Sequence, residues 1–550
     1  MTIVDVLLTS NIYFQKLMKK NTLWIILGLS VLLITCAAVV GIIGVAATIF
    51  FFAAGEEAAQ QPDSIIDPTR FAFFSADAPP EFVPTDCPFA TPRNIDVECG
   101  MVVVPANRTK PENGKAVALA VAIYRSTSAN PEPDPVIYLD GGPGGYTLDV
   151  LPYTLEDSIE PWLQNRDYIT FDQRGIDNSI PMVQCPEITD LERSWLTSQA
   201  NWEDLKPEYL ATMGICRDRL LAEGVDLTGY SSAESAADVD AIRRALGYEQ
   251  VNLFGVSYGT RLAQTVMRDF PDGVRSVILD SAYPAEADLF ENYPRSLNQA
   301  FRVFFDSCAA DAVCNRQYPD LENRFYAVVD VLNEDPKEIE VTNFLTGQTY
   351  DSLFWGDDLI GMLFQTLYSE SMFINMPDII DDLENGEFED AIEVTELFFV
   401  NDDFFSGAVY RTIQCREEYP FSVVANAEVA IQSNPRLIDY FDDYAFTLES
   451  CEVWGAGTAD PIENRPVVSD IPTLILAGGF DPVTPPSWGK SLQANLSQSY
   501  FVEIPQLAHG IFSVNDCTRQ IGLDFVARPT EEPSSACTAN FLDPVFSSPD

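Results

Sequence analysis

The pattern Gly-x-Ser-x-Gly occurs at residues 255–259, between a short apolar run and a stretch with helical spacing. Strand, sharp turn and helix in this order are the parts of a nucleophile elbow. Gly255 and Gly259 leave room beside a turn in which the backbone of the central serine is strained. The five-residue pattern is weak alone, because Gly and Ser are common in loops. In this context it predicts that the Ser257 hydroxyl stands clear of a sheet edge.

Short runs with strand character recur on both sides of this elbow. They cover residues 100–105, 116–124, 136–139, 168–171, 251–254, 274–280, 471–478 and 500–504. Residues 232–246 have helical spacing, and strands that alternate with helical segments predict an α/β fold, a parallel sheet with helices on both faces. Residues 283–465 contain aromatic-rich helical stretches and few strand signals. We therefore predict a large, mostly helical cap inserted over the sheet.

Between Lys20 and Glu56 the sequence carries no charged residue. A membrane helix needs about 20 apolar residues, so this stretch is long enough to cross a bilayer. Lysines precede it and glutamates follow it, so the positive-inside rule places the N-terminus in the cytoplasm and the rest of the chain outside. We favour an uncleaved anchor. A cleaved signal peptide is the alternative, because residues 53–55 are small.

A chain of 550 residues is too long for one compact core. The predicted parts are a cytoplasmic N-terminus over residues 1–20, a single-pass transmembrane anchor over 21–55, a linker over 56–86, the first part of an α/β core over 87–282, the helical cap over 283–465 and the C-terminal part of the core over 466–540. The chain has 83 acidic and 32 basic residues, a net charge of −51, which repels nucleic acid. This charge is typical of a heavily solvated exterior protein, and the alternative is that it attracts cationic peptides.

The cysteines agree with export. One of the eleven, Cys36, lies within the apolar N-terminal stretch, which leaves ten beyond it. In an oxidising compartment an even number predicts five disulfides. Many connectivities are open, and spacing favours neighbours in the sequence: Cys87–Cys99, Cys185–Cys216, Cys308–Cys314, Cys415–Cys451 and Cys517–Cys537. No Cys-x-x-Cys occurs and the chain has a single histidine, so we expect no metal site and no cofactor.

A serine hydroxyl needs a base within hydrogen-bond reach to act as a nucleophile. The one histidine, His509, follows the last predicted strand, and Asp481 follows the strand before it. A lone histidine is more often structural, and an aspartate before a proline is often only a turn residue. The order serine, acid, histidine along the chain carries the assignment. We predict that Ser257 attacks a carbonyl, that His509 moves the proton and that Asp481 orients the imidazole.

A second glycine-rich loop, residues 140–145, follows the strand at residues 136–139. Its glycines allow the backbone to approach a developing oxyanion closely. We predict an oxyanion hole made by the backbone N–H groups of Tyr258 and Gly142, with Gly141 as the alternative to Gly142. A phosphate-binding loop is disfavoured, because the Lys-Ser/Thr of a P-loop is missing.

Several motifs now stand in order along the chain. They are Cys99-Gly100 before Val-Val-Val-Pro105, Leu139-Asp140-Gly-Gly-Pro-Gly144, Phe171-Asp-Gln-Arg-Gly175, Asp238-x-Asp240-Ala-Ile-Arg-Arg-Ala-Leu-Gly247, Gly255-Val-Ser257-Tyr-Gly-Thr260, Asp481-Pro-Val-Thr-Pro485 and His509-Gly510. With them the sequence from about Cys87 to Cys537 resembles the α/β-hydrolase family of secreted tripeptidyl and prolyl aminopeptidases, including its TAP-like C-terminal region. Asp140 is a departure, since many prolyl aminopeptidases have histidine there, and the tripeptidyl branch is more similar at this point.

The resemblance implies a serine exopeptidase that removes residues from the free N-terminus of peptides. Such an enzyme must bind a charged α-amine, and the family often places an acid two residues after the cysteine that corresponds to Cys415. We predict Glu417 in this role, with a solvated surface acid as the alternative. The expected partners are a peptide with a free N-terminus and, through the N-terminal helix, the membrane, with the catalytic domain extracellular or periplasmic.

Two other functions stay open at this point. The first is an esterase or lipase on the same fold, because amide and ester cleavage pass through one oxyanion intermediate. The second is a catalytically dead, membrane-tethered binding protein. Such proteins usually lose the serine, the histidine or an oxyanion glycine, whereas this chain keeps its sole histidine where a triad requires it.

Overall fold

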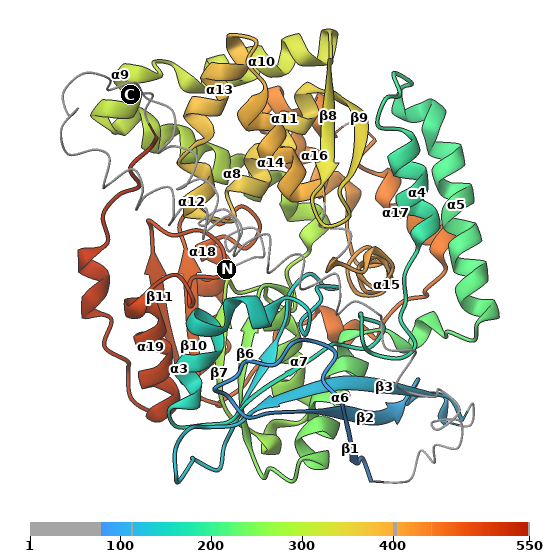
Figure 1. The fold of residues 1–550 in the computed structure, drawn as a ribbon, viewed down its shortest axis with the longest axis vertical. Helices are drawn as coiled ribbons and strands as arrows, with labels where there is room; N and C mark the ends of the chain where they lie inside the picture. Colours follow the sequence, from blue (N-terminus) through green and yellow to red (C-terminus); the bar gives the residue numbers. More distant parts are fainter. Residues whose placement is uncertain (1–78, 112–113, 400–403, 442, 548–550) are drawn as a thin grey trace, which may run out of the picture. The chain divides into compact units, whose positions relative to one another are not determined.

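The computed structural model describes residues 79–547 apart from residues 112–113, 400–403 and 442. Within these residues a nine-stranded sheet has the order β1-β2-β3-β5-β4-β6-β7-β10-β11 (Figure 1). Its strands are β1 (Phe82–Thr85), β2 (Val97–Pro105), β3 (Ala116–Tyr124), β4 (Val136–Leu139), β5 (Tyr168–Phe171), β6 (Val251–Val256), β7 (Val274–Asp280), β10 (Thr473–Gly478) and β11 (Ser499–Ile504). The strands from β5 to β11 are parallel, and β1, β2, β3 and β5 pair antiparallel.

The prediction of a parallel sheet is therefore wrong at one edge. Residues 106–115 connect β2 to β3, and a connection this short makes an antiparallel hairpin, because a parallel pair needs a crossover of roughly a dozen residues or more. The linker was predicted over residues 56–86, of which residues 56–78 lie outside the described part of the chain. Its last residues form β1, whose Phe82 ring covers Gly100 so closely that a Cβ there would lie 2.5 Å from the ring.

Both faces of the sheet are covered, as predicted. Consecutive side chains of a strand point to opposite faces. Leu253 of β6 belongs to the apolar cluster that includes α6 (Ser232–Ala245) and α7 (Tyr258–Asp269). The next residue, Phe254, packs against Trp162 of α3 (Glu160–Leu163) at a centroid distance of 5.9 Å. On that face α3 also contacts α19 (Asp516–Ala527).

The region between β7 and β10 forms a mostly helical cap with its own aromatic core. Its helices are α8 (Leu289–Ala310), α9 (Ala312–Gln317), α10 (Leu321–Glu334), α11 (Gly356–Thr366), α12 (Glu370–Phe373), α13 (Met376–Glu384), α14 (Glu389–Phe399), α15 (Gly407–Glu417), α16 (Val424–Gln432) and α17 (Phe446–Trp454). Phe301, Phe304 and Phe325 are buried at the centre of this core. The cap also contains a hairpin that the sequence did not predict, β8 (Lys337–Asn343) and β9 (Gln348–Phe354). In the turn of this hairpin, the Asn343 side chain accepts hydrogen bonds from the backbone N–H groups of the next turn residues, and Gly347 has a φ of +70°.

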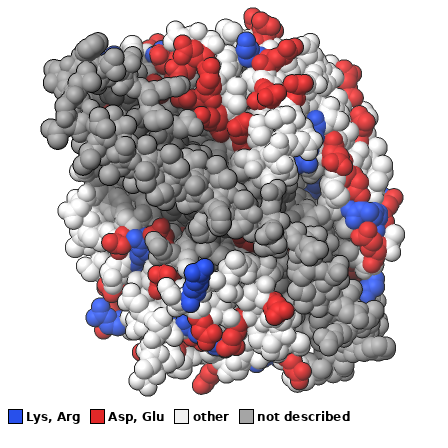
Figure 2. Space-filling view, viewed as in Figure 1, with Lys and Arg blue, Asp and Glu red and all other residues white. Residues whose placement is uncertain are grey.

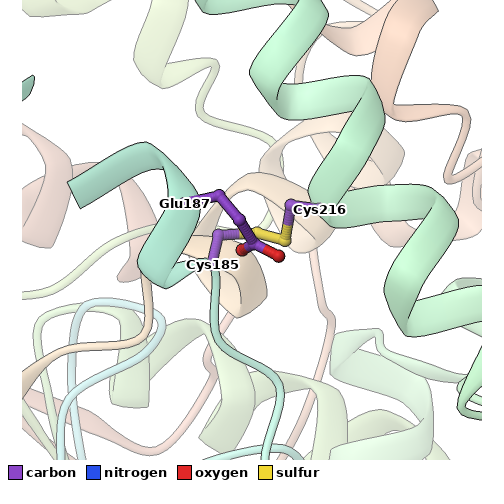
Figure 3. Close-up of side chains that lie close together, drawn as sticks. All are labelled: Cys185, Glu187 and Cys216. Carbon is purple, nitrogen blue, oxygen red and sulfur yellow. A yellow bond between two sulfur atoms is a disulfide. The ribbon is translucent and has the colours of Figure 1, made fainter. Parts of the chain in front are cut away.

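A helical pair from before the elbow joins the cap, beyond the predicted range 283–465. α4 (Pro186–Ser194) and α5 (Trp202–Ala222) are linked by the disulfide Cys185–Cys216 (Figure 3). Trp202 packs edge-on against Phe446 of α17 at 4.8 Å. The helical pair α4–α5 and the cap helices therefore share apolar contacts.

All five predicted disulfides are present: Cys87–Cys99, Cys185–Cys216, Cys308–Cys314, Cys415–Cys451 and Cys517–Cys537. The predicted cytoplasmic segment 1–20 and the predicted anchor 21–55 lie outside the described residues. Among the helices of the part that is described, none combines the length and apolar character needed to span a bilayer.

Candidate active site

Ser257 occupies the sharp turn between β6 and α7, with a φ of 57° and a ψ of −126°. Few non-glycine residues adopt a positive φ, so this backbone is strained. The neighbouring glycines make the turn possible. A Cβ on Gly255 would lie 2.4 Å from the carbonyl oxygen of Gly259, and a Cβ on Gly259 would lie 1.9 Å from that of Leu139. The structure therefore has the elbow that the sequence predicts.

Asp481 and His509 meet beyond the carboxyl ends of β10 and β11. Asp481 Oδ2 lies 2.8 Å from His509 Nδ1, and the aspartate is only 3% exposed. The backbone N–H groups of Val483 and Thr484 donate to Oδ1, and the Thr484 hydroxyl donates to Oδ2. An ionised carboxylate only accepts, so the shared proton belongs to Nδ1 and Nε2 is left to accept a proton.

The loop that carries His509 also touches the elbow and the cap. Gly510 has a φ of +72°, and a Cβ there would lie 3.5 Å from Cγ1 of Val256, the residue before the serine. The backbone N–H of His509 donates to the carbonyl oxygen of Tyr368 at 3.4 Å. The Tyr368 ring, just after α11, lies edge-on to the imidazole at a centroid distance of 4.8 Å. The cap and His509 are thus in direct contact.

The glycine-rich loop after β4 lies against the serine. A Cβ on Gly141 would be 3.1 Å from Ser257 Cβ and 3.6 Å from its Oγ. The Gly141 N–H donates to the side chain of Asp140 at 2.8 Å, and burial raises the pKa of that carboxyl group. Because the Gly141 amide already has an acceptor, the arrangement favours Gly142, which is exposed, as the oxyanion donor. Tyr258 is the first residue of α7, where backbone N–H groups have no partner within the helix.

A segment of the cap is hydrogen-bonded to this glycine loop. Tyr146 N–H donates to the carbonyl oxygen of Phe404 at 3.1 Å, and Ser406 N–H donates to that of Gly144 at 2.8 Å. The Phe405 ring lies 3.1 Å from the place that a Gly142 Cβ would take. An aromatic ring of the cap therefore borders the predicted oxyanion hole.

Two of the sequence motifs meet in a structural ion pair away from the serine. The buried guanidinium of Arg174 donates to both carboxylate oxygens of Asp238 at 2.7 Å. The same guanidinium donates to the carbonyl oxygens of Ala106 and Gly229. These bonds tie the loop after β5 to α6, which explains the two motifs without a catalytic role.

Glu417, the predicted amine-binding residue, ends α15 and is completely buried. Its carboxylate accepts hydrogen bonds from the N–H and the hydroxyl of Ser232, at 2.5 and 2.6 Å. The Tyr258 hydroxyl lies 2.8 Å from that same serine oxygen. Arg261 Nε lies 3.7 Å from Glu417 Oε2, and its Nη1 lies 2.7 Å from Glu418 Oε1. We call Glu417, Arg261 and Glu418 the Glu-Arg-Glu cluster.

Burial raises the pKa of Glu418 to about 7, and Arg261 opposes this shift. Glu418 also accepts a hydrogen bond from the N–H of Leu289, at the start of α8. In the cluster two carboxylates contact one guanidinium, so the direct contacts leave one carboxylate charge in excess when both acids are ionised. The Ser232 hydroxyl group connects Glu417 of this cluster to the hydroxyl group of Tyr258, the residue that follows Ser257. The amine-binding role of Glu417 stays a prediction.

Among the described residues, one group of three side chains has ligand atoms close enough together to bind a metal ion: Cys185, Glu187 and Cys216. Figure 3 shows that its two sulfur atoms are bonded to each other as a disulfide, and Glu187 is paired with Arg219. These sulfurs are not free to bind a metal ion.

The order of strand, strained serine and helix, with a histidine–aspartate pair after later strands, is the architecture of serine hydrolases built on an α/β sheet. A family model described as alpha/beta hydrolase fold matches residues 134–516, and the chain belongs to this family. Serine protease Hip1 of Mycobacterium tuberculosis is 23% identical over 459 residues, 80% of this chain and 86% of that protein. Tripeptidyl aminopeptidase of Streptomyces lividans is 32% identical over 204 residues, 35% of this chain and 36% of that protein.

A proline iminopeptidase structure from Mycobacterium smegmatis matches with a TM-score of 0.36 and 14% identity, over 75% of this chain and 96% of that one. Together, the family and the sequence relatives identify the chain as a serine hydrolase, and they support a serine peptidase on the α/β hydrolase fold.

Sequence reasoning missed several residues of this site. Thr484 lies within a motif that was recognised, but its hydroxyl was given no partner. Tyr368 and Phe405 lie more than a hundred residues from the histidine or the glycine loop that they border, and no local pattern marks them. Ser232 opens a predicted helix, where serine is expected as a terminal residue. Its contact with Glu417 depends on the fold.

Proposed function

We propose that the chain is an extracytoplasmic, membrane-anchored serine exopeptidase that releases residues from the N-terminus of peptides. Ser257, His509 and Asp481 form its catalytic triad. The Asp481–His509 hydrogen bond of 2.8 Å, on loops that contact the strained elbow, is the observation that carries the catalytic part. The sequence relatives named as a serine protease and a tripeptidyl aminopeptidase support a peptide substrate.

In this proposal Ser257 Oγ attacks the scissile carbonyl while His509 Nε2 takes the hydroxyl proton. A tetrahedral oxyanion forms and faces the N–H groups of Tyr258 and Gly142. Collapse of this intermediate breaks the amide bond, and His509 gives its proton to the leaving amine. Water then attacks the acyl-enzyme by the same route. Asp481 stays ionised and holds the imidazole through Nδ1, while Thr484 holds Asp481.

The Glu-Arg-Glu cluster supports recognition of a free N-terminus. When both acids are ionised, a substrate ammonium group that approached this cluster would balance its excess carboxylate charge. Because the cluster is buried, such a charge pair is screened less than it would be in water. We propose Glu417 as the amine-binding residue, with Glu418 as its partner.

The proposed location outside the cell is supported by the five disulfides, which form and persist in oxidising compartments. Figure 2 shows that carboxylates are more prominent than cationic side chains on the face in view, including its upper part, where the cap helices lie in Figure 1. We propose that residues 21–55 anchor the chain with its N-terminus in the cytoplasm.

The first test is covalent labelling of the purified full-length chain with a fluorophosphonate probe, followed by mass spectrometry of the labelled peptide. We expect the label on Ser257 and none on the Ser257→Ala variant. A peptide mixture incubated with the wild-type protein is expected to lose residues from its N-termini, and the masses of the products give the number released. An unlabelled Ser257, or cleavage within peptides whose N-termini are blocked, would contradict the proposal.

The second test addresses the amine site. Glu417→Gln is expected to raise KM for substrates with a free amine and to spare N-blocked esters, because only the former need the charge. Glu463→Gln is the matched control, since Glu463 is buried nearby but its side chain pairs with Arg268. Equal losses on free and blocked substrates would remove Glu417 from this role, and Glu418→Gln measured in the same way tests its partner.

A further inference from the structure

Three consecutive backbone N–H groups after His509 donate to the end of β7. Gly510 donates to the Ser281 hydroxyl at 2.8 Å, Ile511 to Asp280 Oδ1 at 3.0 Å and Phe512 to Asp280 Oδ2 at 2.8 Å. Asp280 is 1% exposed and Ser281 is fully buried. A buried carboxylate that accepts from two successive amides makes a fixed, charge-assisted contact. The turn that presents the imidazole is therefore held by these two residues.

The same two residues also hold the other members of the site. The Ser257 N–H donates to the backbone carbonyl oxygen of Asp280 at 3.0 Å. The Ser281 N–H donates to the carbonyl oxygen of Leu476 in β10, the strand that leads to Asp481. Ser281 has a φ of 58°, which is the kind of strain that persists only where surrounding contacts enforce it. One dipeptide thus joins the elbow, the strand before the acid and the loop of the base.

We propose that Asp280, together with Ser281, positions His509 relative to Ser257. Its carbonyl oxygen fixes the amide of the nucleophile, and its carboxylate fixes the amides that follow the base. The distance between the serine and the imidazole is then set by these two residues at the end of β7. Asp280 has no contact with substrate in this scheme and acts through the backbone. The inference rests on the proposed roles of Ser257 and His509.

The hydrogen bonds and the burial of Asp280 have opposite effects on its charge. Burial raises its pKa to about 6, whereas the amides of Phe512 and Ile511 and the nearby His509 lower it. Tyr138 is a further titratable group that interacts with Asp280. Above pH 6 the ionised carboxylate can accept both amides, while a neutral amide side chain offers only one acceptor oxygen.

The test compares Asp280→Asn with the wild-type full-length chain. Asparagine has the shape of aspartate, but its NH2 group would face one of the two N–H donors. The loop is then held by one bond fewer, and the imidazole is displaced. We expect kcat and the rate of fluorophosphonate labelling to fall about 10- to 100-fold, because a displacement of about 1 Å can cost roughly 100-fold in rate. KM is expected to change less than about threefold, since no substrate contact is lost.

Asp134→Asn is the matched control. Asp134 is also a buried aspartate of this sheet, but it lies before β4, at the opposite end of the strands, and accepts from Arg166 and Asn252. The Asp134→Asn substitution is expected to lower the midpoint of thermal unfolding while kcat stays within about twofold. Ser281→Ala removes one neutral hydrogen bond from the same loop, and we expect kcat to fall roughly three- to tenfold with KM unchanged.

The outcomes separate the two proposals. If the wild-type chain is not labelled at Ser257, the catalytic assignment fails and this inference fails with it. If the wild type is labelled and Asp280→Asn, folded, retains its kcat within about twofold, only the positioning role is overturned. If Asp280→Asn does not fold, Ser281→Ala decides, and an unchanged kcat in that variant would overturn the role. A raised KM with an unchanged kcat would assign Asp280 to binding instead.

Discussion

Replacing Gly259 with alanine tests the geometry of the elbow most directly. Gly259 is the second residue of α7. A Cβ there would lie 1.9 Å from the carbonyl oxygen of Leu139, 2.7 Å from its carbonyl carbon and 3.0 Å from the oxygen of Asp140. All three are backbone atoms at the end of β4, so no side-chain rotation can relieve the contact.

The size of the effect follows from these distances. Real Cβ atoms rarely come within 3.0 Å of another heavy atom, so helix and strand must separate by about 1.1 Å to move from 1.9 Å to that limit. Overpacking of this kind costs about 1–3 kcal/mol or more, and the gain of about 0.5–1 kcal/mol for alanine over glycine in a helix offsets only part of it. Because β4 leads directly into the loop with Gly141 and Gly142, a shift of about 1 Å also predicts a rate loss of roughly 100-fold.

The assay combines thermal unfolding with the rate of fluorophosphonate labelling of the full-length chain. Gly361→Ala is the control, since Gly361 also lies within a helix, α11, but nothing lies within 4 Å of its Cβ position. The control is expected to be neutral or stabilised by about 0.5–1 kcal/mol. The reasoning is refuted if the Gly259→Ala variant is labelled at the same rate as the wild type and unfolds at the same temperature. The close approach of α7 and β4 would then not constrain the residue at position 259.

Three further predictions concern the acid, the buried carboxyls and a disulfide. Asp481→Asn is expected to lower kcat about 10⁴-fold; a loss below tenfold would contradict the triad. Burial raises the pKa of Asp280 to about 6 and that of Glu418 to about 7, so the folded chain holds protons that the unfolded chain releases above about pH 4. Their contribution to stability is lost as the pH rises through 6 to 7, and we expect a higher unfolding temperature at pH 5.5 than at pH 7.5; the reverse order would count against it. Removing Cys415–Cys451, which closes 36 residues, is expected to cost about 4 kcal/mol of unfolding free energy, measured with denaturant; a loss under 1 kcal/mol would contradict the chain-entropy argument.

Much of the sheet could be predicted because its central strands are buried on both faces. Val136–Leu139 and Tyr168–Phe171 are short, almost wholly apolar runs, which are typical of such strands. The strand Phe82–Thr85 was missed because it is an edge strand of four residues that contains a proline. The hairpin Lys337–Asn343 and Gln348–Phe354 was missed because both strands begin with exposed polar residues, as a solvated loop does, although residues 338–341 alternate acidic and apolar side chains in the way of a half-buried strand.

In the candidate site, too, some contacts could be predicted from the sequence and others could not. The order of Ser257, Asp481 and His509 along the chain follows from the order of the strands in this fold, so the contact between Asp481 and His509 could be predicted. The partners of Glu417 could not, because Ser232 and Arg261 reach it from two other helices. Which carboxylate is buried and which is solvated depends on packing that no local sequence pattern encodes.

The backbone contacts between cap and core have a consequence for how such a chain can diversify. Phe404 and Ser406 are hydrogen-bonded to the glycine loop, and Tyr368 to the loop of His509. A cap joined in this way cannot be exchanged for another without rebuilding both loops. Insertions and deletions that alter which substrates fit are therefore expected to change turnover at the same time. Variation that leaves the rate intact should be confined to cap segments without such bonds, such as the turn between β8 and β9.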